Sequence, residues 1–116
     1  MPGITRLPTS HSYSAAVAAG DFVFLGLHRG FGEDFDTQLA GTIDHLTRTL
    51  AECRLVLGDL VKVHVYLKRI GDLPRMEQGF AGHFPDEAYP ARMTTTTEFI
   101  DADCLLMIDG VAYRGS

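Results

Sequence analysis

In residues 60–68, "LVKVHVYLK", apolar side chains alternate with polar or aromatic ones from Val61 onward. Successive side chains of an extended strand point to opposite faces, so one face of this segment is apolar and the other is polar or aromatic. The apolar face consists of Val61, Val63, Val65 and Leu67. The segment therefore predicts a strand with one face buried against a hydrophobic layer, which other parts of the chain must supply.

Two helices are predicted to supply that layer. In the first, Asp36 is the expected N-cap, and apolar residues recur every three or four positions, which places them on one side of a helix. These residues are Leu39, Ile43, Leu46, Leu50 and Cys53. The second helix is predicted to begin after Asp72 and to end before Pro85, because proline cannot continue a helix. Its apolar positions are Leu73, Met76, Phe80 and Phe84.

Five further segments have the composition of strands or are set off by turn residues. They are residues 4–7, 15–18, 21–28, 92–99 and 104–113. Together with the segment at 60–68 and the two helices, they predict one α+β domain over residues 1–116, with a single sheet and two helices on one of its faces. The other face of such a sheet still needs cover, and self-association is the simplest way to supply it.

Composition and charge narrow the class of function. The chain has 116 residues, 46% of them hydrophobic, and a formal net charge of −5. Nucleic-acid binding draws most of its affinity from clustered lysine and arginine, whereas the basic residues here are scattered, so we expect no nucleic-acid partner. No segment resembles a signal peptide or approaches the roughly 20 apolar residues of a membrane span, so we expect no membrane partner and a cytoplasmic location.

Arg92 opens the predicted strand at 92–99, directly after a Tyr-Pro-Ala turn, and shares a strand face with Thr94. A guanidinium held there by the backbone can bind a carboxylate with two parallel N–H···O bonds, which fix the orientation of the anion. The alternative is a structural ion pair with a nearby acid, Glu87 or Glu98.

The residues around this arginine, together with four other segments, resemble the RidA (YjgF/YER057c/UK114) family. The five segments are the triplet Pro90-Ala91-Arg92, Tyr13 ahead of an Ala-Val pair, "AAGDFVF" at 18–24, "LGDLVKVHVYL" at 57–67 and "LLMIDGVAY" at 105–113. They follow the order and the separations of the family over nearly the entire chain.

This resemblance implies a chorismate mutase-like α+β fold, with a six-stranded mixed sheet and two helices on one face. It also implies a homotrimer whose sheets form a central barrel, with pockets in the clefts between subunits. In members that are enamine/imine deaminases, the arginine of the Pro-Ala-Arg triplet binds the carboxylate of 2-aminoacrylate-type imines derived from amino acids. Arg92 is the matching position and Tyr13 matches a tyrosine of the same pocket, so both are expected to be catalytic.

Two departures from the family pattern fall at pocket positions. Met107 stands where the deaminases carry a glutamate that handles the attacking water, and Gly26-Leu27 stand where they carry a Ser-Gly pair. Asp109 does not simply replace the glutamate, because the family usually has an acid at that position as well. Gly26, His28 and Met107 complete the expected substrate-binding set. His28 is the expected substitute for the lost acid–base group, and an exposed or structurally hydrogen-bonded histidine is the alternative.

Other kinds of site are not indicated by the sequence. The five histidines never fall at ligand spacing, and no HxH or HExxH motif occurs, so we expect neither a metal nor a cofactor. Cys53 and Cys104 lie in apolar segments without a CxxC motif and are expected to be buried thiols. Asp44 and His45 are expected on the solvent face of the first helix.

Two functions that share one pocket remain open. The first is a trimeric hydrolase that converts reactive, carboxylate-bearing enamines and imines to keto acids and ammonia. The second is a non-enzymatic protein that binds a small molecule such as a 2-keto acid in the same cleft between subunits. A ribonuclease or translation inhibitor, the role named for some relatives, is not favoured because the acidic chain shows no basic groove.

Overall fold

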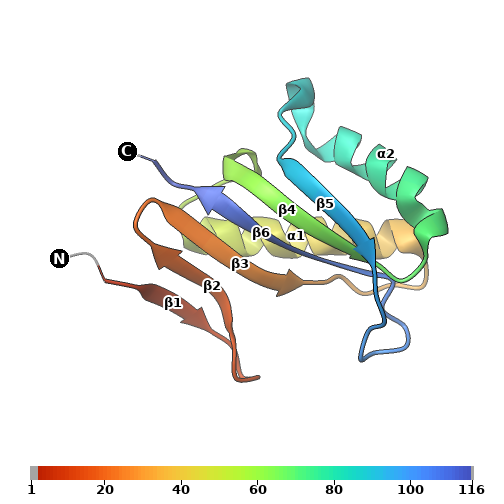
Figure 1. The fold of residues 1–116 in the computed structure, drawn as a ribbon, viewed down its shortest axis with the longest axis horizontal. Coiled ribbons are helices and arrows are strands. Elements are labelled where there is room, and N and C mark those ends of the chain that lie inside the picture. The colour runs from red at the N-terminus through yellow and green to blue at the C-terminus, as the bar shows by residue number, and fades with distance from the viewer. Residues whose placement is uncertain (1–2, 116) are drawn as a thin grey trace.

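A computed structural model describes residues 3–115 of the chain (Figure 1). Its strands are β1 (Thr5–Pro8), β2 (Ser14–Ala19), β3 (Phe22–His28), β4 (Leu60–Leu67), β5 (Ala91–Thr96) and β6 (Leu106–Tyr113). Its α-helices are α1 (Phe35–Glu52), between β3 and β4, and α2 (Leu73–His83), between β4 and β5. This order of elements is the one predicted from the sequence.

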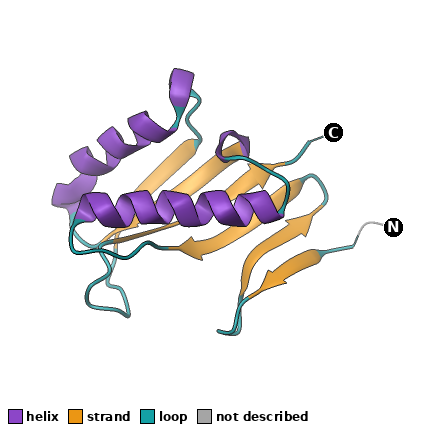
Figure 2. Cartoon of the chain, turned by 180° about the vertical axis from the view of Figure 1, so that it is seen from behind, coloured by secondary structure: helices purple, strands orange, loops and turns teal. Residues whose placement is uncertain are grey.

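The strands form one six-stranded sheet in the order β1-β2-β3-β6-β4-β5. Neighbouring strands run antiparallel except for β4 and β5, which are parallel because the chain between them crosses over through α2. Figure 2 shows both helices on the same face of this sheet. The prediction of an α+β fold with a mixed sheet and two helices on one face is therefore confirmed.

The buried side chains of β4 follow the predicted alternation along most of the strand. They are Leu60, Val63, Val65 and Leu67. The prediction for Val61 is wrong, because this residue is exposed and Leu60 takes the buried position instead. The register of β4 against β6 shifts between Leu60 and Lys62, and this irregularity turns Val61 away from the core.

The first helix covers the sheet with the apolar side predicted for it. Its buried apolar residues are Phe35, Leu39, Ile43, Leu46 and Leu50. The prediction of its N-cap is wrong: Asp34 is the cap, and its side chain accepts a hydrogen bond of 2.8 Å from the backbone N–H of Thr37. Asp36 lies inside the first turn and pairs with Arg75 of α2 at 3.0 Å. Cys53 is the C-cap residue, and it is only half-buried because the helix ends there.

The second helix begins after Asp72 and ends before Pro85, as predicted, although the Asp72 side chain makes no capping hydrogen bond. Its core residues are Met76 and Phe80, followed by the buried C-cap residue Phe84. A Cβ atom at Gly79 would overlap the side chain of Leu39 in α1, so this glycine lets the two helices approach closely. In the part of the chain that the structure describes, no helix has both the length and the apolar character that a membrane span requires.

The face of the sheet opposite the helices carries large side chains that the rest of residues 3–115 leave uncovered. Phe22, Phe24, Met93 and Tyr113 are each between 42% and 53% exposed. On the same face, the His64 ring stacks on the Tyr66 ring with their centres 4.0 Å apart. The uncovered face expected from the sequence is therefore present.

The two C-terminal strands are shorter than predicted. The fifth strand ends at Thr96 rather than at residue 99, and the sixth begins at Leu106 rather than at residue 104. Both Thr96 and Leu106 pair with Leu67, the last residue of β4, so neither strand has a partner in β4 beyond that point. Residues 97–105 form the loop between the two strands.

Candidate functional site

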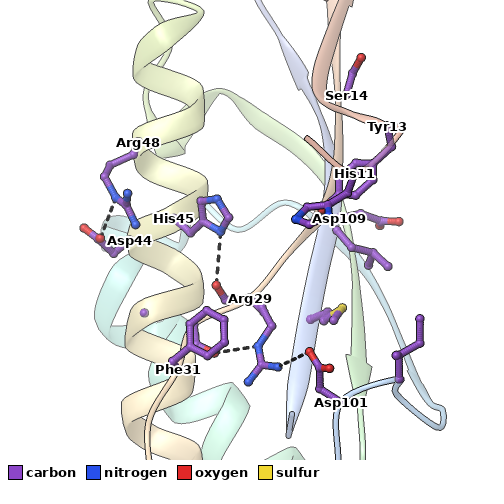
Figure 3. Close-up of a pocket in the computed structure, with 16 residues that line it drawn as sticks. His11, Tyr13, Ser14, Arg29, Phe31, Asp44, His45, Arg48, Asp101 and Asp109 are labelled. Carbon is purple, nitrogen blue, oxygen red and sulfur yellow. Dashed lines mark hydrogen bonds and ion pairs between the residues drawn. The ribbon is translucent and has the colours of Figure 1, made fainter. Parts of the chain in front are cut away.

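A cavity of about 1030 Å³ lies between α1 and the strands β2, β3 and β6, and Figure 3 shows the residues that line it. Its walls come from the turn before β2, the end of β3 and the connector after it, one side of α1, part of β6 and the β5–β6 loop. Apolar groups in the lining include Leu27, Phe31, Ile100 and Met107. Polar groups include Tyr13, Arg29, His45 and Asp109. A mostly apolar hollow with a few polar groups is the usual form of a small-molecule site.

The cavity forms where β3 departs from regular pairing with β6. The register of this pair shifts between Leu25 and His28, which leaves Gly26 and Leu27 outside the regular ladder. Gly26 has little room for a side chain, since a Cβ atom there would lie 3.2 Å from the carbonyl oxygen of Ser14. Leu27 is exposed and lines the cavity. The Gly-Leu pair therefore forms one wall of the cavity with its backbone and with a single apolar side chain.

Three of the residues expected in the substrate site lie together in this cavity. They are Tyr13, Gly26 and Met107. They come from the turn before β2, from β3 and from β6, and the strand order places these three strands side by side. Tyr13 is exposed and its ring lies 6.5 Å from that of His11, whereas Met107 is half-buried.

His28, the last residue of β3, points into the core and is not among the residues that line the cavity. Its Nδ1 donates to the carbonyl oxygen of Gly26 at 2.6 Å, and its Nε2 lies 2.9 Å from the hydroxyl of Thr49. Burial lowers the pKa of His28 below its ordinary value of 6.5, so the ring is neutral at neutral pH. The structure thus favours the alternative, a structurally hydrogen-bonded histidine, over a substrate-binding one.

Arg92 lies on the sheet face that carries the helices, because its register partner in β4 is a buried residue. Its guanidinium donates to Glu77 of α2 at 3.0 Å and lies 5.9 Å from the centre of the Phe80 ring. The ion-pair partner of Arg92 is thus Glu77, and it is neither Glu87 nor Glu98, the two acids considered from the sequence. Arg92 does not line the cavity, and its side chain is 30% exposed on the edge strand β5.

A second arginine, which sequence reasoning did not place in the site, forms part of the cavity wall. The Arg29 side chain is only 10% exposed, and it pairs with Asp101 at 3.3 Å and with Asp103 at 3.4 Å. Its guanidinium carbon lies 4.2 Å from the centre of the Phe31 ring. These contacts fasten the connector after β3 to the β5–β6 loop, as Figure 3 shows for Asp101.

Gln38 of α1 joins the same two segments from inside the protein. Its side-chain amide nitrogen donates to the carbonyl oxygens of Gly32 at 3.0 Å and Asp103 at 2.8 Å. Its amide oxygen accepts from the backbone N–H of Leu105 at 2.9 Å. The buried amide is therefore fully used in holding the walls of the cavity against α1.

The expectation that His45 lies on the solvent face of α1 is wrong. His45 is half-buried and lines the cavity, and its Nδ1 lies 3.3 Å from the backbone carbonyl oxygen of Arg29. Asp44 is exposed, as expected. The sequence does hold a signal for this side of α1, a polar stripe at helical spacing. Its members are Gln38, Thr42, His45 and Thr49.

Within residues 3–115, no group of three or more histidine, cysteine, aspartate or glutamate side chains is arranged to hold a metal ion. Cys104 is a buried free thiol, as predicted, whereas Cys53 is a half-buried one. Burial raises the pKa of both thiols, which lowers their thiolate fraction and their reactivity.

Comparison with known proteins gives a match over nearly the whole chain. Residues 3–114 match the family model described as "Endoribonuclease L-PSP". RutC family proteins of Pyrococcus abyssi and Pyrococcus horikoshii are each 30% identical to this chain over 110 residues. Each match covers 88% of this chain and 86% of the relative.

Solved structures with the same fold carry the same family names. A yjgF family member from Streptococcus pyogenes M1 GAS has a TM-score of 0.88 at 32% identity, covering 97% of this chain and 98% of that one. A YjgF family protein from Neisseria meningitidis has a TM-score of 0.92 at 24% identity, covering 98% of this chain and 97% of that one. Because the family model spans nearly the entire chain and relatives at 30% identity agree with it, this chain belongs to the RidA (YjgF/YER057c/UK114) family.

Proposed function

We propose that this protein is a cytoplasmic deaminase that hydrolyses reactive enamines and imines bearing a carboxylate, of the 2-aminoacrylate type, to keto acids and ammonia. The site lies in a cleft between subunits of a homotrimer and uses no cofactor. Arg92 of one copy holds the substrate carboxylate, and the cavity lined by Tyr13, Gly26 and Met107 of another copy holds the rest. Family membership supports this class of reaction.

The observation that carries this proposal is the separation of Arg92 from the cavity within one chain. Arg92 is on the edge strand β5, and the strands β4 and β6 lie between it and β3. Neighbouring strands are about 4.8 Å apart, so three such spacings put about 14 Å between β3 and β5. Arg92 and Tyr13 of the same chain are thus too far apart to hold one small substrate. An arginine at an open sheet edge can instead enter the cavity of a second copy.

The uncovered face of the sheet supports the assembly that this site requires. Its exposed aromatic and methionine side chains would be costly to leave in water on a stable monomer. They are Phe22, Phe24, Met93 and Tyr113. Packing of three such faces around a threefold axis would bury them and close the assembly.

The contact between Arg92 and Glu77 is weak enough for a substrate to compete with it. The two side chains are 30% and 53% exposed, and an ion pair this open to water contributes at most about 1 kcal/mol. A carboxylate that approaches with two oxygens can form two parallel hydrogen bonds to the guanidinium, and a cleft closed by a second copy excludes water from them. In the protein without substrate, the ion pair with Glu77 then serves to orient the Arg92 side chain.

The cavity offers groups for the chemistry as well as for binding. Hydrolysis of a protonated imine needs water at the electrophilic carbon while the carboxylate is held still, and orientation with electrostatics can supply most of the rate increase. The Tyr13 hydroxyl can hydrogen-bond the substrate nitrogen or the water. Met107 shapes the apolar wall but transfers no proton.

The same methionine favours a second candidate function. With no acid–base group at position 107, the cleft can hold a 2-keto acid through Arg92 without turning anything over. The protein would then be a small-molecule binding protein that uses the same two parts of the site.

Turnover by the wild type separates these functions, and replacement of Arg92 tests the anchor that both of them use. An amino-acid imine is generated in situ by an auxiliary enzyme, and keto acid and ammonia are measured for wild type, Arg92→Ala and the control Arg75→Ala. Arg75 also pairs with an acid, Asp36, at 3.0 Å, so the control removes the same charge and a comparable ion pair. We expect only Arg92→Ala to lower kcat/KM, by about 10- to 100-fold, which corresponds to one charge-assisted anchor.

Calorimetry with pyruvate completes the test. Pyruvate binding by the wild type that is lost in Arg92→Ala would support the binding-protein function, provided that the wild type shows no catalysed turnover. Equal rates for wild type and Arg92→Ala would contradict the deaminase with Arg92 as its anchor.

A further inference from the structure

We propose that His45 of α1 is the acid–base group of this cavity, moving protons to and from the attacking water and the leaving nitrogen. The inference rests on the proposed deamination and adds a catalytic residue to it. It starts from the placement of His45, whose half-buried side chain lines the cavity together with Tyr13 and Met107. In Figure 3 its ring extends from α1 toward the side of the cavity where His11 and Tyr13 lie.

The hydrogen bond of the His45 ring fixes which nitrogen can accept a proton. Its Nδ1 lies 3.3 Å from the backbone carbonyl oxygen of Arg29. A carbonyl oxygen only accepts hydrogen bonds, so in the neutral ring the proton is on Nδ1 and the lone pair is on Nε2. The backbone thus plays the orienting part that a carboxylate or carbonyl plays for a general base. His45 is held as a base with Nε2 as its accepting atom.

Each carboxylate around the cavity has a hydrogen-bond partner, whereas the Nε2 atom of His45 has none among the described residues. On α1, Asp44 accepts from Arg48 one turn further along, at 3.0 Å. In the β5–β6 loop, Asp101 is bound by Arg29 at 3.3 Å. On β6, Asp109 accepts from a tyrosine hydroxyl of β4 at 3.3 Å. The two arginines, Arg29 and Arg48, carry only N–H donors and no acceptor, so they can stabilise negative charge but cannot serve as bases.

Two other histidines lie near His45, and neither is placed as it is. The ring of His28 is 4.4 Å from that of His45, but His28 is buried and both of its nitrogens contact other protein groups. His11 lines the cavity from the turn before β2, yet it is exposed, and among the described residues no hydrogen bond holds its ring. His45 is therefore the imidazole that is both fixed in orientation and open to the cavity.

The protons and charges of imine hydrolysis balance with His45 as the only protein group that carries protons. Nε2 takes a proton from water while the water oxygen bonds to the carbon of the protonated imine, which gives a neutral carbinolamine group and an imidazolium. The imidazolium then protonates the amine nitrogen, the carbon–nitrogen bond breaks as the hydroxyl becomes a carbonyl, and the hydroxyl proton passes to Nε2 and on to the departing ammonia. The products are a keto acid and ammonium, and His45 ends neutral.

His45→Asn tests this role, because the asparagine amide can still donate to the Arg29 carbonyl oxygen but cannot act as a base. We expect kcat to fall by about 10²-fold with KM changed by less than about twofold, since acid–base catalysis contributes 10²-fold or more. His83→Asn, the matched change at an exposed histidine of α2 whose Nδ1 also contacts a backbone carbonyl oxygen, that of Gly79 at 2.8 Å, should retain wild-type kcat. Added imidazole should restore part of the activity of His45→Ala, which a merely structural role for His45 would not allow.

The pH dependence gives a separate readout. His45→Asn should alter the pH–rate profile of the wild type, because it removes an acid–base group, whereas His83→Asn should leave that profile unchanged. If wild type is active and Arg92→Ala is not, but His45→Asn keeps the rate and pH profile of wild type, the role of His45 is overturned and the proposed deamination stands. Absence of turnover by the wild type overturns both.

Discussion

Replacing Gln38 by methionine should lower the free energy of unfolding by about 3 kcal/mol. The side chain keeps its length and approximate volume, so the change creates little empty space. It removes the three hydrogen bonds to the carbonyl oxygens of Gly32 and Asp103 and to the N–H of Leu105. Each such bond contributes about 1 kcal/mol, and the half-buried N–H of Leu105 loses its partner without gaining ready access to water.

Urea unfolding followed by circular dichroism, at one fixed protein concentration, measures this loss. The matched control is Gln78→Met, the same change at an exposed position of α2, which should shift stability by less than about 0.5 kcal/mol. The concentration is fixed because association would add to the apparent stability. If Gln38→Met cost no more than Gln78→Met, the amide would not be what holds the connector and the β5–β6 loop against α1.

Further predictions concern α2, His28 and the thiols. Gly82→Ala should stabilise the protein by about 0.5–1 kcal/mol through helix propensity, because a Cβ there meets nothing within 4 Å. Gly79→Ala should destabilise it, because that Cβ meets Leu39, and equal shifts of the two variants in urea unfolding would refute the close packing of α1 on α2. Burial lowers the pKa of His28 in the folded state, so the unfolded chain binds the proton more tightly and stability should fall as pH drops below 6.5. His28→Gln should flatten that decline in urea titrations, and an unchanged slope would contradict it. Native Cys104 should be alkylated far more slowly than Cys53, and equal labelling by mass spectrometry would show that Cys104 is not buried.

The fold could be predicted from the sequence because apolar residues recur at regular spacing within its strands and helices. Alternation in β4 and helical spacing in α1 and α2 identify the faces that are buried, and these are local properties of the chain. The exceptions are local events that periodicity does not record. The irregularity beside Val61 shifts one residue out of the alternating pattern. The N-cap of α1 is Asp34 rather than Asp36, although both are aspartates and aspartate suits that position.

The site was only partly accessible, because its residues meet through tertiary contacts. Tyr13 and Met107 were found through family resemblance, and the structure places both at one cavity. Glu77 was missed as the partner of Arg92, because nothing in the sequence shows that α2 packs beside the start of β5. Sequence patterns do not place His45 in the site, because a polar residue on an amphipathic helix is expected to face solvent. Here a polar stripe of α1 instead faces the connector and the cavity.

Mixed oligomers test most directly whether the site is shared between copies. Arg92→Ala and Tyr13→Ala are each expected to be strongly impaired alone, the first for lack of the anchor and the second for lack of a cavity hydroxyl. In trimers assembled from equal amounts of both, about a quarter of the clefts would pair an intact Arg92 with an intact Tyr13 from another copy. We predict imine hydrolysis at about a quarter of the wild-type rate, whereas a mixture no more active than its two parents would show that one chain supplies both residues.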